Sequence, residues 1–199
     1  MTSGLFGVDY ACQLMDPPWL ERGAGKVKRG ANRWYDLMDV VDIRRTILDS
    51  GQWRPAFDAH LWMWVTDNFL EDGLWLTKQL GFRYVRTFVW VKLRDEVPRS
   101  NLPTAIDVAR DALQIGLGQY ARGSHELLLF AVRGHIPVPP PERRHPSVFF
   151  SERGRHSAKP AVSYEVIESV SPGPRVEFFA RSARKGWTPW GNESPETTR

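Results

Sequence analysis

Strand-like and helix-like segments alternate along the chain, and this alternation limits the folds open to it. Apolar runs typical of buried strands lie at Tyr10–Met15, Ala59–Val65, Tyr84–Val91, Glu126–Val132 and Val176–Phe179. Helical spacing is found at Asp39–Ser50, Asp67–Leu80, Ala105–Ile115 and about Pro160–Ser169. This order predicts an α/β fold with a central, mostly parallel sheet and helices on both faces.

Length and composition bound the class of protein. The 199 residues suit a single domain, 1–199, with a core of about residues 9–193 and a disordered tail at 194–199. Cys12 is the only cysteine and the five histidines are scattered, so we expect no disulfide and no metal. We find neither a membrane-spanning stretch nor a signal-peptide pattern. We therefore expect a cytoplasmic protein with no membrane partner.

The first expected strand runs directly into the tetrapeptide Asp16-Pro17-Pro18-Trp19. Proline cannot continue a central ladder, so the strand ends here, at the edge of the sheet where α/β proteins bind ligands. Two prolines also remove two backbone donors, so we expect outward-pointing carbonyl oxygens without competing N–H groups beside the Asp16 carboxylate. A strand that ends at prolines before a surface aromatic is an equally weighted reading of these four residues alone.

The functional reading of the tetrapeptide is a grip on an aromatic amine such as adenine N6. We expect the Asp16 carboxylate and the Pro17 carbonyl to accept its two hydrogens, while Trp19 offers a face or an edge of its ring. Adenine N6 is a poor nucleophile, and fixed acceptors offset the positive charge that grows as it attacks a sulfonium methyl group. Such preorganised stabilisation contributes roughly 3 kcal/mol per well-placed group. Asp16 would then orient the amine and stabilise charge rather than act as a strong base.

Two basic clusters lie in expected loops, one after the tetrapeptide and one before the last helix. Loop charges are usually solvated, but both clusters would flank one mouth of the sheet, which favours salt-sensitive contacts with phosphates. Trp34 and Tyr35, with Trp19, are candidates for packing against an extruded base, although Trp34 and Tyr35 could equally anchor their loop. The basic residues expected to contact nucleic acid are Lys26, Lys28, Arg29, Arg33, Arg153 and Arg155.

Several blocks together resemble one family. Tyr10–Trp19 is similar to the signature of the family that contains the catalytic subunit of the mRNA N6-adenosine methyltransferase and bacterial and phage adenine methyltransferases. The resemblance covers about residues 9–193 in one order. Its further blocks are Ala59–Phe69, Gly81–Lys92, Arg122–Gly134, His156–Pro160, Glu177–Arg181 and Gly186–Glu193.

The resemblance implies a Rossmann-like S-adenosylmethionine-dependent methyltransferase fold with permuted motif order, in which the catalytic strand comes first and the cofactor-binding strand last. It implies that Lys159 reaches the methionine carboxylate or the ribose of S-adenosyl-L-methionine, and that Asp16 lies close to the methionine end and the target amine. Further cofactor contacts would come from Phe179, Arg181, Asn192 and Glu193. The implied catalytic residues are Asp16, Pro17, Pro18 and Trp19.

The chain also departs from the family. Ala183 and Arg184 stand where the eukaryotic enzyme has a His-Asn pair, so the ribose contacts of that pair are not carried over. The tetrapeptide, which the pseudo-enzyme subunits of the family have lost, is intact.

These observations together predict a site-specific DNA (adenine-N6) methyltransferase, because compact members without extra domains resemble the bacterial and phage enzymes. RNA is the second substrate. The alternatives are a non-catalytic nucleic-acid-binding subunit of a methyltransferase complex and a small-molecule methyltransferase. A homodimer or an accessory subunit is compatible with any of these.

Overall fold

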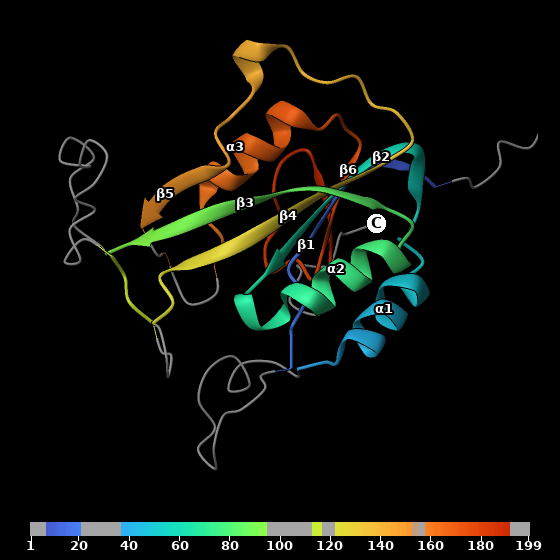
Figure 1. The fold of residues 1–199 in the computed structure, drawn as a ribbon. Helices are drawn as coiled ribbons and strands as arrows, with labels where there is room; N and C mark the ends of the chain where they lie inside the picture. Colours follow the sequence, from blue (N-terminus) through green and yellow to red (C-terminus); the bar gives the residue numbers. More distant parts are fainter. Residues whose placement is uncertain are drawn as a thin grey trace, which may run out of the picture.

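The computed structural model describes residues 7–20, 37–94, 113–116, 122–152, 154 and 158–191. Its centre is a seven-stranded sheet in the order β5-β3-β4-β2-β1-β6-β7 (Figure 1). The strands are β1 (Tyr10–Met15), β2 (Pro55–Val65), β3 (Arg83–Leu93), β4 (His125–Arg133), β5 (Val148–Glu152), β6 (Arg175–Phe178) and β7 (Trp187–Trp190).

The sheet is mostly parallel. β1 pairs in parallel with β2 and β6, as β3 does with β5 and β6 with β7. β4 is inserted between β2 and β3 and runs antiparallel to both. The amino end of β4 therefore lies at the edge where β1, β2 and β3 have their carboxyl ends, so residues from the start of β4 and the ends of these strands meet there.

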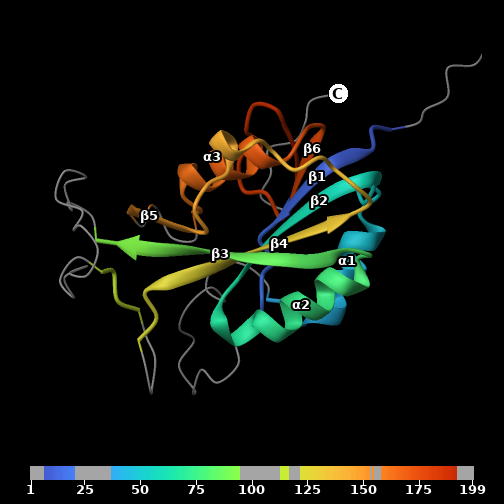
Figure 2. The ribbon, with the colours of Figure 1, turned by 45° about the horizontal axis from the view of Figure 1, so that its top comes forward.

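Helices cover both faces of the sheet, as predicted. α1 (Val40–Asp49) and α2 (Leu70–Gln79) lie on one face and α3 (Ala161–Val170) on the other (Figure 2). Asp39 caps α1 by accepting a hydrogen bond of 2.8 Å from the Asp42 amide, which satisfies an otherwise free donor. Two short 3-10 helices, η2 (Asp67–Phe69) and η4 (Pro141–Arg143), complete the described elements. No helix among the described residues has the length and apolar character needed to cross a membrane.

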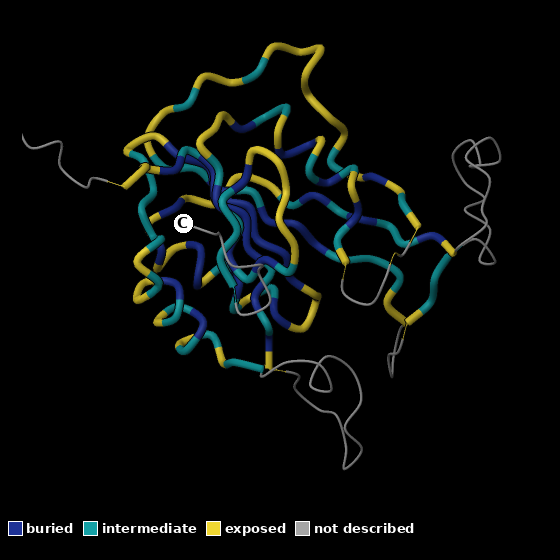
Figure 3. The backbone as a smooth tube through the Cα atoms, turned by 180° about the vertical axis from the view of Figure 1, so that it is seen from behind, coloured by how far each residue is buried: buried dark blue, intermediate teal, exposed yellow. Residues whose placement is uncertain are grey.

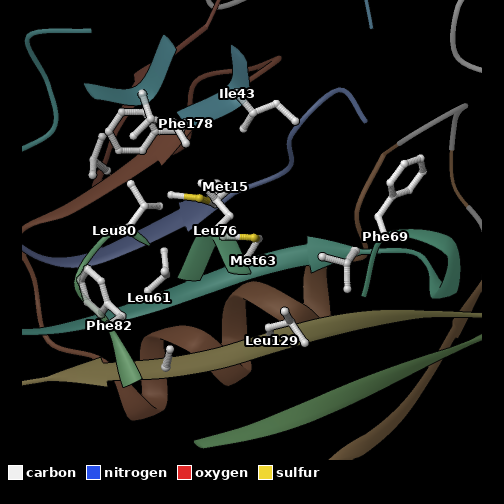
Figure 4. Close-up of a cluster of buried hydrophobic side chains, with 14 of the residues drawn as sticks. Met15, Ile43, Leu61, Met63, Phe69, Leu76, Leu80, Phe82, Leu129 and Phe178 are labelled. Atoms are coloured by element: carbon white, nitrogen blue, oxygen red, sulfur yellow. The ribbon is translucent and has the colours of Figure 1, made fainter. Parts of the chain in front are cut away.

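The alternation of side chains along β2 explains why the sheet has two cores. Leu61, Met63 and Val65 pack toward α1 and α2, whereas Trp62 and Trp64 pack on the side of α3. Figure 4 shows the first cluster, with Ile43 of α1 and Leu76 of α2 beside the strands. A strand segment buried on both faces forms a continuous apolar run, as Leu61–Val65 does at the carboxyl half of β2. The tube in Figure 3 shows buried residues gathered in the central strands and exposed ones in the connections.

The sequence-based elements correspond closely to the observed ones. The strand at Tyr10–Met15 is confirmed with its predicted bounds, and the other four strands and three of the helices are confirmed with small shifts at their ends. The helix expected at Asp67–Leu80 begins with a 3-10 turn. β5 and β7 were not predicted. The tail at 194–199 and residues 105–112 of the helix expected at Ala105–Ile115 lie outside the described residues. Leu113, near the end of that expected helix, instead forms an antiparallel bridge with Leu93.

Candidate active site at the carboxyl edge of the sheet

The tetrapeptide leaves β1 at its carboxyl end and is pinned by backbone hydrogen bonds. The Trp19 amide donates to the Pro17 carbonyl at 2.9 Å, and the Met38 amide donates to the Pro18 carbonyl at 2.8 Å. The expectation that these carbonyls have no competing donor is therefore wrong. A carbonyl oxygen has two lone pairs, so Pro17 keeps one acceptor position for a ligand.

Asp16 lies at the meeting point of three segments. Its Oδ1 is 3.0 Å from Nζ of Lys159, which precedes α3, and its Oδ2 is 3.8 Å from the guanidinium of Arg181, which follows β6. The Asp16 and Lys159 side chains are only 18% and 13% exposed. The structure thus brings together three residues that the sequence predicted for one site.

Two further charged residues extend this contact, and sequence reasoning missed both. Glu126 Oε2 is 3.0 Å from Lys159 Nζ, and Glu126 Oε1 is 2.6 Å from Nζ of Lys92. Glu126 is the second residue of β4, directly before the apolar run of that strand, and Lys92 lies near the end of β3. A charged residue at the entry to a buried strand was the available signal. We call Asp16, Lys159, Glu126, Lys92 and Arg181 the charged network.

Burial and charge oppose each other in this network. Burial raises the pKa of Asp16, and the like charge of Glu126 adds to that effect against the opposing charge of Lys159. Burial also acts to raise the pKa of Glu126, but Lys159 and Lys92 outweigh it and hold the pKa below its usual value. The two carboxylates likewise outweigh burial at Lys159 and raise its pKa. Lys159 is therefore a cation divided between two carboxylates, and Asp16 is the carboxylate at which burial outweighs the neighbouring cations.

Trp19 is held inside the fold rather than at its surface. The residue is 9% exposed, its indole Nε1 donates to the Trp64 carbonyl at 3.1 Å, and its ring stacks on Phe69 at 5.5 Å. These contacts give the ring an anchoring role, because one of its faces is already covered. The tetrapeptide is fixed against the end of β2 as a result.

A tight turn after β6 delivers the other cofactor candidates. Phe179 has a φ of 61°, a left-handed conformation that is uncommon outside glycine. The Ala180 amide donates to the Trp190 carbonyl at 2.9 Å. A Cβ on Gly191 would lie 2.8 Å from the Ala180 backbone, so only glycine fits this approach. The turn carries Phe179 and Arg181 to the same edge as Asp16.

A second polar group lies on the α3 side of β6. The Tyr164 hydroxyl donates to Glu177 Oε1 at 2.8 Å, and the Arg184 guanidinium lies 3.7 Å from the Tyr164 ring centre. Burial raises the pKa of Glu177, with a further contribution from the charge of Asp16. Arg184, noted above as a departure from the family, is therefore part of a defined cluster beside the charged network.

Other predicted site residues lie outside the described residues. They are Lys26, Lys28, Arg29, Arg33, Trp34, Tyr35, Arg153, Arg155, Asn192 and Glu193. The Leu20 amide donates to the Met38 carbonyl at 2.9 Å, so Met38 lies beside the end of the tetrapeptide. Within the described part of the chain, no group of three or more His, Cys, Asp or Glu side chains is placed to hold a metal ion.

Comparison with known proteins gives one family. The MT-A70 family model matches residues 10–193. The chain is 29% identical over 143 residues to the type II methyltransferase M.MunI of Mycoplasma sp, a match that covers 71% of this chain and 53% of that protein. It is 30% identical over 192 residues to the N6-methyladenosine RNA methyltransferase MTA1 of Pyricularia oryzae, covering 90% and 46%.

A more distant relative belongs to the human proteome. The chain is 25% identical over 190 residues to the N(6)-adenosine-methyltransferase catalytic subunit METTL3 of Homo sapiens, covering 92% of this chain and 28% of METTL3. The chain spans about half the length, or less, of these three relatives.

Proposed function

Because this chain belongs to the MT-A70 family, we propose that it transfers a methyl group from S-adenosyl-L-methionine to the exocyclic N6 amine of adenine in nucleic acid. The observation that carries the proposal is the Asp16–Lys159 contact of 3.0 Å, which fixes the carboxylate of an Asp-Pro-Pro-Trp segment at the carboxyl edge of the sheet. We further propose that residues 9–193 form one catalytic domain.

The residues present fit the cofactor. An ammonium group has three donors, so Lys159 can hold Asp16 and Glu126 and still reach an anionic group such as the methionine carboxylate. The strand order reverses at β1 and β6, since β2 lies on one side of this pair and β7 on the other. Ligands of open α/β sheets bind at such a point. Phe179 and Arg181 would line the side toward the nucleoside, and we propose Asn192 and Glu193 as further contacts with it.

When bound, the cofactor would supply a methyl group on a positively charged sulfur. That sulfur is the leaving group, and its departure needs no metal ion. The protein's part is to hold the amine. Asp16 would accept one amine hydrogen and the remaining lone pair of Pro17 the other, so that the nitrogen lone pair is free to form the new carbon–nitrogen bond. The cofactor's sulfur would keep the electron pair of its broken bond to the methyl carbon, and the amine proton would leave to water. Asp16 stabilises the positive charge on nitrogen before that proton is lost.

We propose DNA as the preferred nucleic acid, with RNA as the alternative. The similarity to the type II methyltransferase M.MunI supports DNA, whereas the similarity to the N6-methyladenosine RNA methyltransferase MTA1 supports RNA. Phosphate contacts would come from Lys26, Lys28, Arg29, Arg33, Arg153 and Arg155, with Trp34 and Tyr35 against the extruded base. A homodimer or an accessory subunit would extend this surface. A non-catalytic nucleic-acid-binding subunit is the rival from another class.

The experiment is transfer of labelled methyl from S-adenosyl-L-methionine to single- and double-stranded DNA, RNA and free adenosine, followed by mass analysis of the nucleosides. We expect N6-methyladenine in a nucleic acid, most of it in DNA, and no product without the protein. Methylation of free adenosine alone would assign a small-molecule methyltransferase. Absence of cofactor binding in calorimetry would assign a scaffold subunit.

A further inference from the structure

Lys92 occupies an unusual place relative to the site. It lies on β3, which β4 and β2 separate from β1, and its side chain is 20% exposed. Its Nζ is 2.6 Å from Glu126 Oε1 and 5.2 Å from the centre of the Trp90 ring. We propose that Lys92 is a positioning residue, which holds Glu126 so that Lys159 remains on Asp16. This role of Lys92 rests on the proposed function of Asp16, but the NMR titration that tests it needs no enzyme activity.

The backbone fixes Lys92 beside Glu126. The Lys92 amide donates to the Ser124 carbonyl at 2.9 Å, and Trp90 faces Glu126 in the β3–β4 register. Because β4 is antiparallel to its neighbours, Glu126 at its amino end lies where β3 has its carboxyl end. The short ion pair is thus set by sheet pairing rather than by a flexible surface contact.

Glu126 is the bridge between Lys92 and the tetrapeptide. Each of its two oxygens has a different lysine, with Lys92 on Oε1 and Lys159 on Oε2. Lys159 in turn reaches Asp16 at 3.0 Å. Three contacts of 2.6, 3.0 and 3.0 Å therefore connect Lys92 to the carboxylate that is proposed to grip the amine.

The charges explain what the bridge does. Two carboxylates, Asp16 and Glu126, compete for Lys159. Without Lys92, Glu126 would depend on Lys159 alone and would draw its ammonium group away from Asp16. Arg181 is not equivalent to Lys159 as a partner of Asp16, since its contact with Asp16 is longer, at 3.8 Å. His125, the neighbour of Glu126 in β4, lies 3.2 Å from the Asp67 carboxylate and so has a partner of its own.

The same residue could instead bind a phosphate of the substrate or only stabilise β3. A phosphate contact would change nucleic-acid affinity and its salt dependence. A purely structural role would change the free energy of unfolding and nothing else. Neither role predicts a change in the ionisation of Asp16, which lies on another strand end, so that ionisation is the diagnostic quantity.

The test is a carbon-13 NMR titration of the Asp and Glu carboxyl groups in wild type, Lys92→Met and Lys92→Arg. In Lys92→Met the Asp16–Glu126 pair should take up its first proton on acidification at a pH about one unit higher, because a neighbouring cation has gone. The Asp16 curve should change with it, and Lys92→Arg should restore both. Lys78→Met, on the exposed end of α2, is the matched control and should leave both curves unchanged.

An Asp16 titration curve that superimposes on wild type in Lys92→Met would overturn the inference, whatever happens at Glu126. In the methyl-transfer assay, the acid limb of kcat in Lys92→Met should move in the same direction, while KM for nucleic acid stays within about twofold. A higher KM with an unchanged pH profile would assign Lys92 to phosphate binding instead. If wild type transfers no methyl group, the proposed function fails, while the NMR result still decides the role of Lys92.

Discussion

The two ends of the strands in this sheet bury polar side chains in opposite ways. At the carboxyl edge, the charged network combines carboxylates and cationic side chains that are 13% to 29% exposed. Toward the other end, a neutral group is almost completely buried. The indole Nε1 of Trp62 donates to Ser171 Oγ at 2.8 Å, and that oxygen lies 2.9 Å from His60 Nδ1.

The difference separates structure from chemistry. Burial lowers the pKa of His60 to about 4, so the imidazole is neutral at neutral pH. It completes a hydrogen-bonded group within the core on the α3 side of the sheet. The groups of the charged network stay ionised, because each carboxylate faces a cation. Lys159 also keeps one N–H donor that neither carboxylate uses. A buried neutral group fixes the fold, whereas a half-buried charged group can exchange a partner for a ligand.

The largest effect should come from Asp16→Ala. Turnover should fall by roughly a thousandfold or more, because the group that orients the amine and stabilises its charge is lost. Binding of S-adenosyl-L-methionine in calorimetry should be weakened but detectable. Asp58→Ala is the matched control, since its carboxylate accepts from the His135 amide at 2.7 Å, far from the carboxyl end of β1. Full activity of Asp16→Ala would remove the proposed mechanism.

A smaller effect is expected on acid stability, and it should arise at the other end of the sheet. The unfolded chain binds a proton at His60 near its usual pKa of 6.5, whereas the folded chain binds it only near 4. The unfolded state therefore holds more protons between these values, and stability should fall as pH drops through that window. The loss is at most about 3 kcal/mol.

Denaturant unfolding of wild type and His60→Gln between pH 7 and 4 measures this contribution. The difference in slope between the two proteins isolates His60 from the carboxylates that titrate in the same range. Parallel curves would show that His60 is no more buried in the folded state than in the unfolded one.

The smallest expected effect belongs to Ser171→Ala. Loss of the hydroxyl leaves the Trp62 indole and the His60 ring without this partner, which should cost roughly 2 kcal/mol of stability. The control is Ser169→Ala, whose hydroxyl donates only to the Val166 carbonyl of its own helix at 2.7 Å. Methyl transfer should be unchanged in both. A loss of kcat in Ser171→Ala without loss of stability would contradict the division between the two ends.

The fold was largely predictable because its central elements carry local signals. The apolar run at Tyr10–Met15 ends at proline, and Asp39 caps a helix with clear spacing. β5 and β7 have no such pattern, since they are short edge strands and β7 contains Pro189. They are formed by pairing with β3 and β6, which the sequence does not reveal.

The site was predictable only in part, for a related reason. Asp16, Lys159 and Arg181 were assigned from blocks that follow one another in the expected order. Glu126 and Lys92 belong to the same contact only because β4 runs against its neighbours, a property of long-range pairing. The expectation that the Pro17 carbonyl has no competing donor was wrong, because in the turn after β1 this oxygen accepts a hydrogen bond from the Trp19 amide.

The position of S-adenosylhomocysteine in a co-crystal tests the central claim most directly. We predict that its carboxylate lies within hydrogen-bond distance of Lys159 Nζ and that its sulfur lies beside Asp16, between the carboxyl ends of β1 and β6. A ligand bound elsewhere, with Lys159 still engaged only by Asp16 and Glu126, would contradict the assignment of the charged network as the active site.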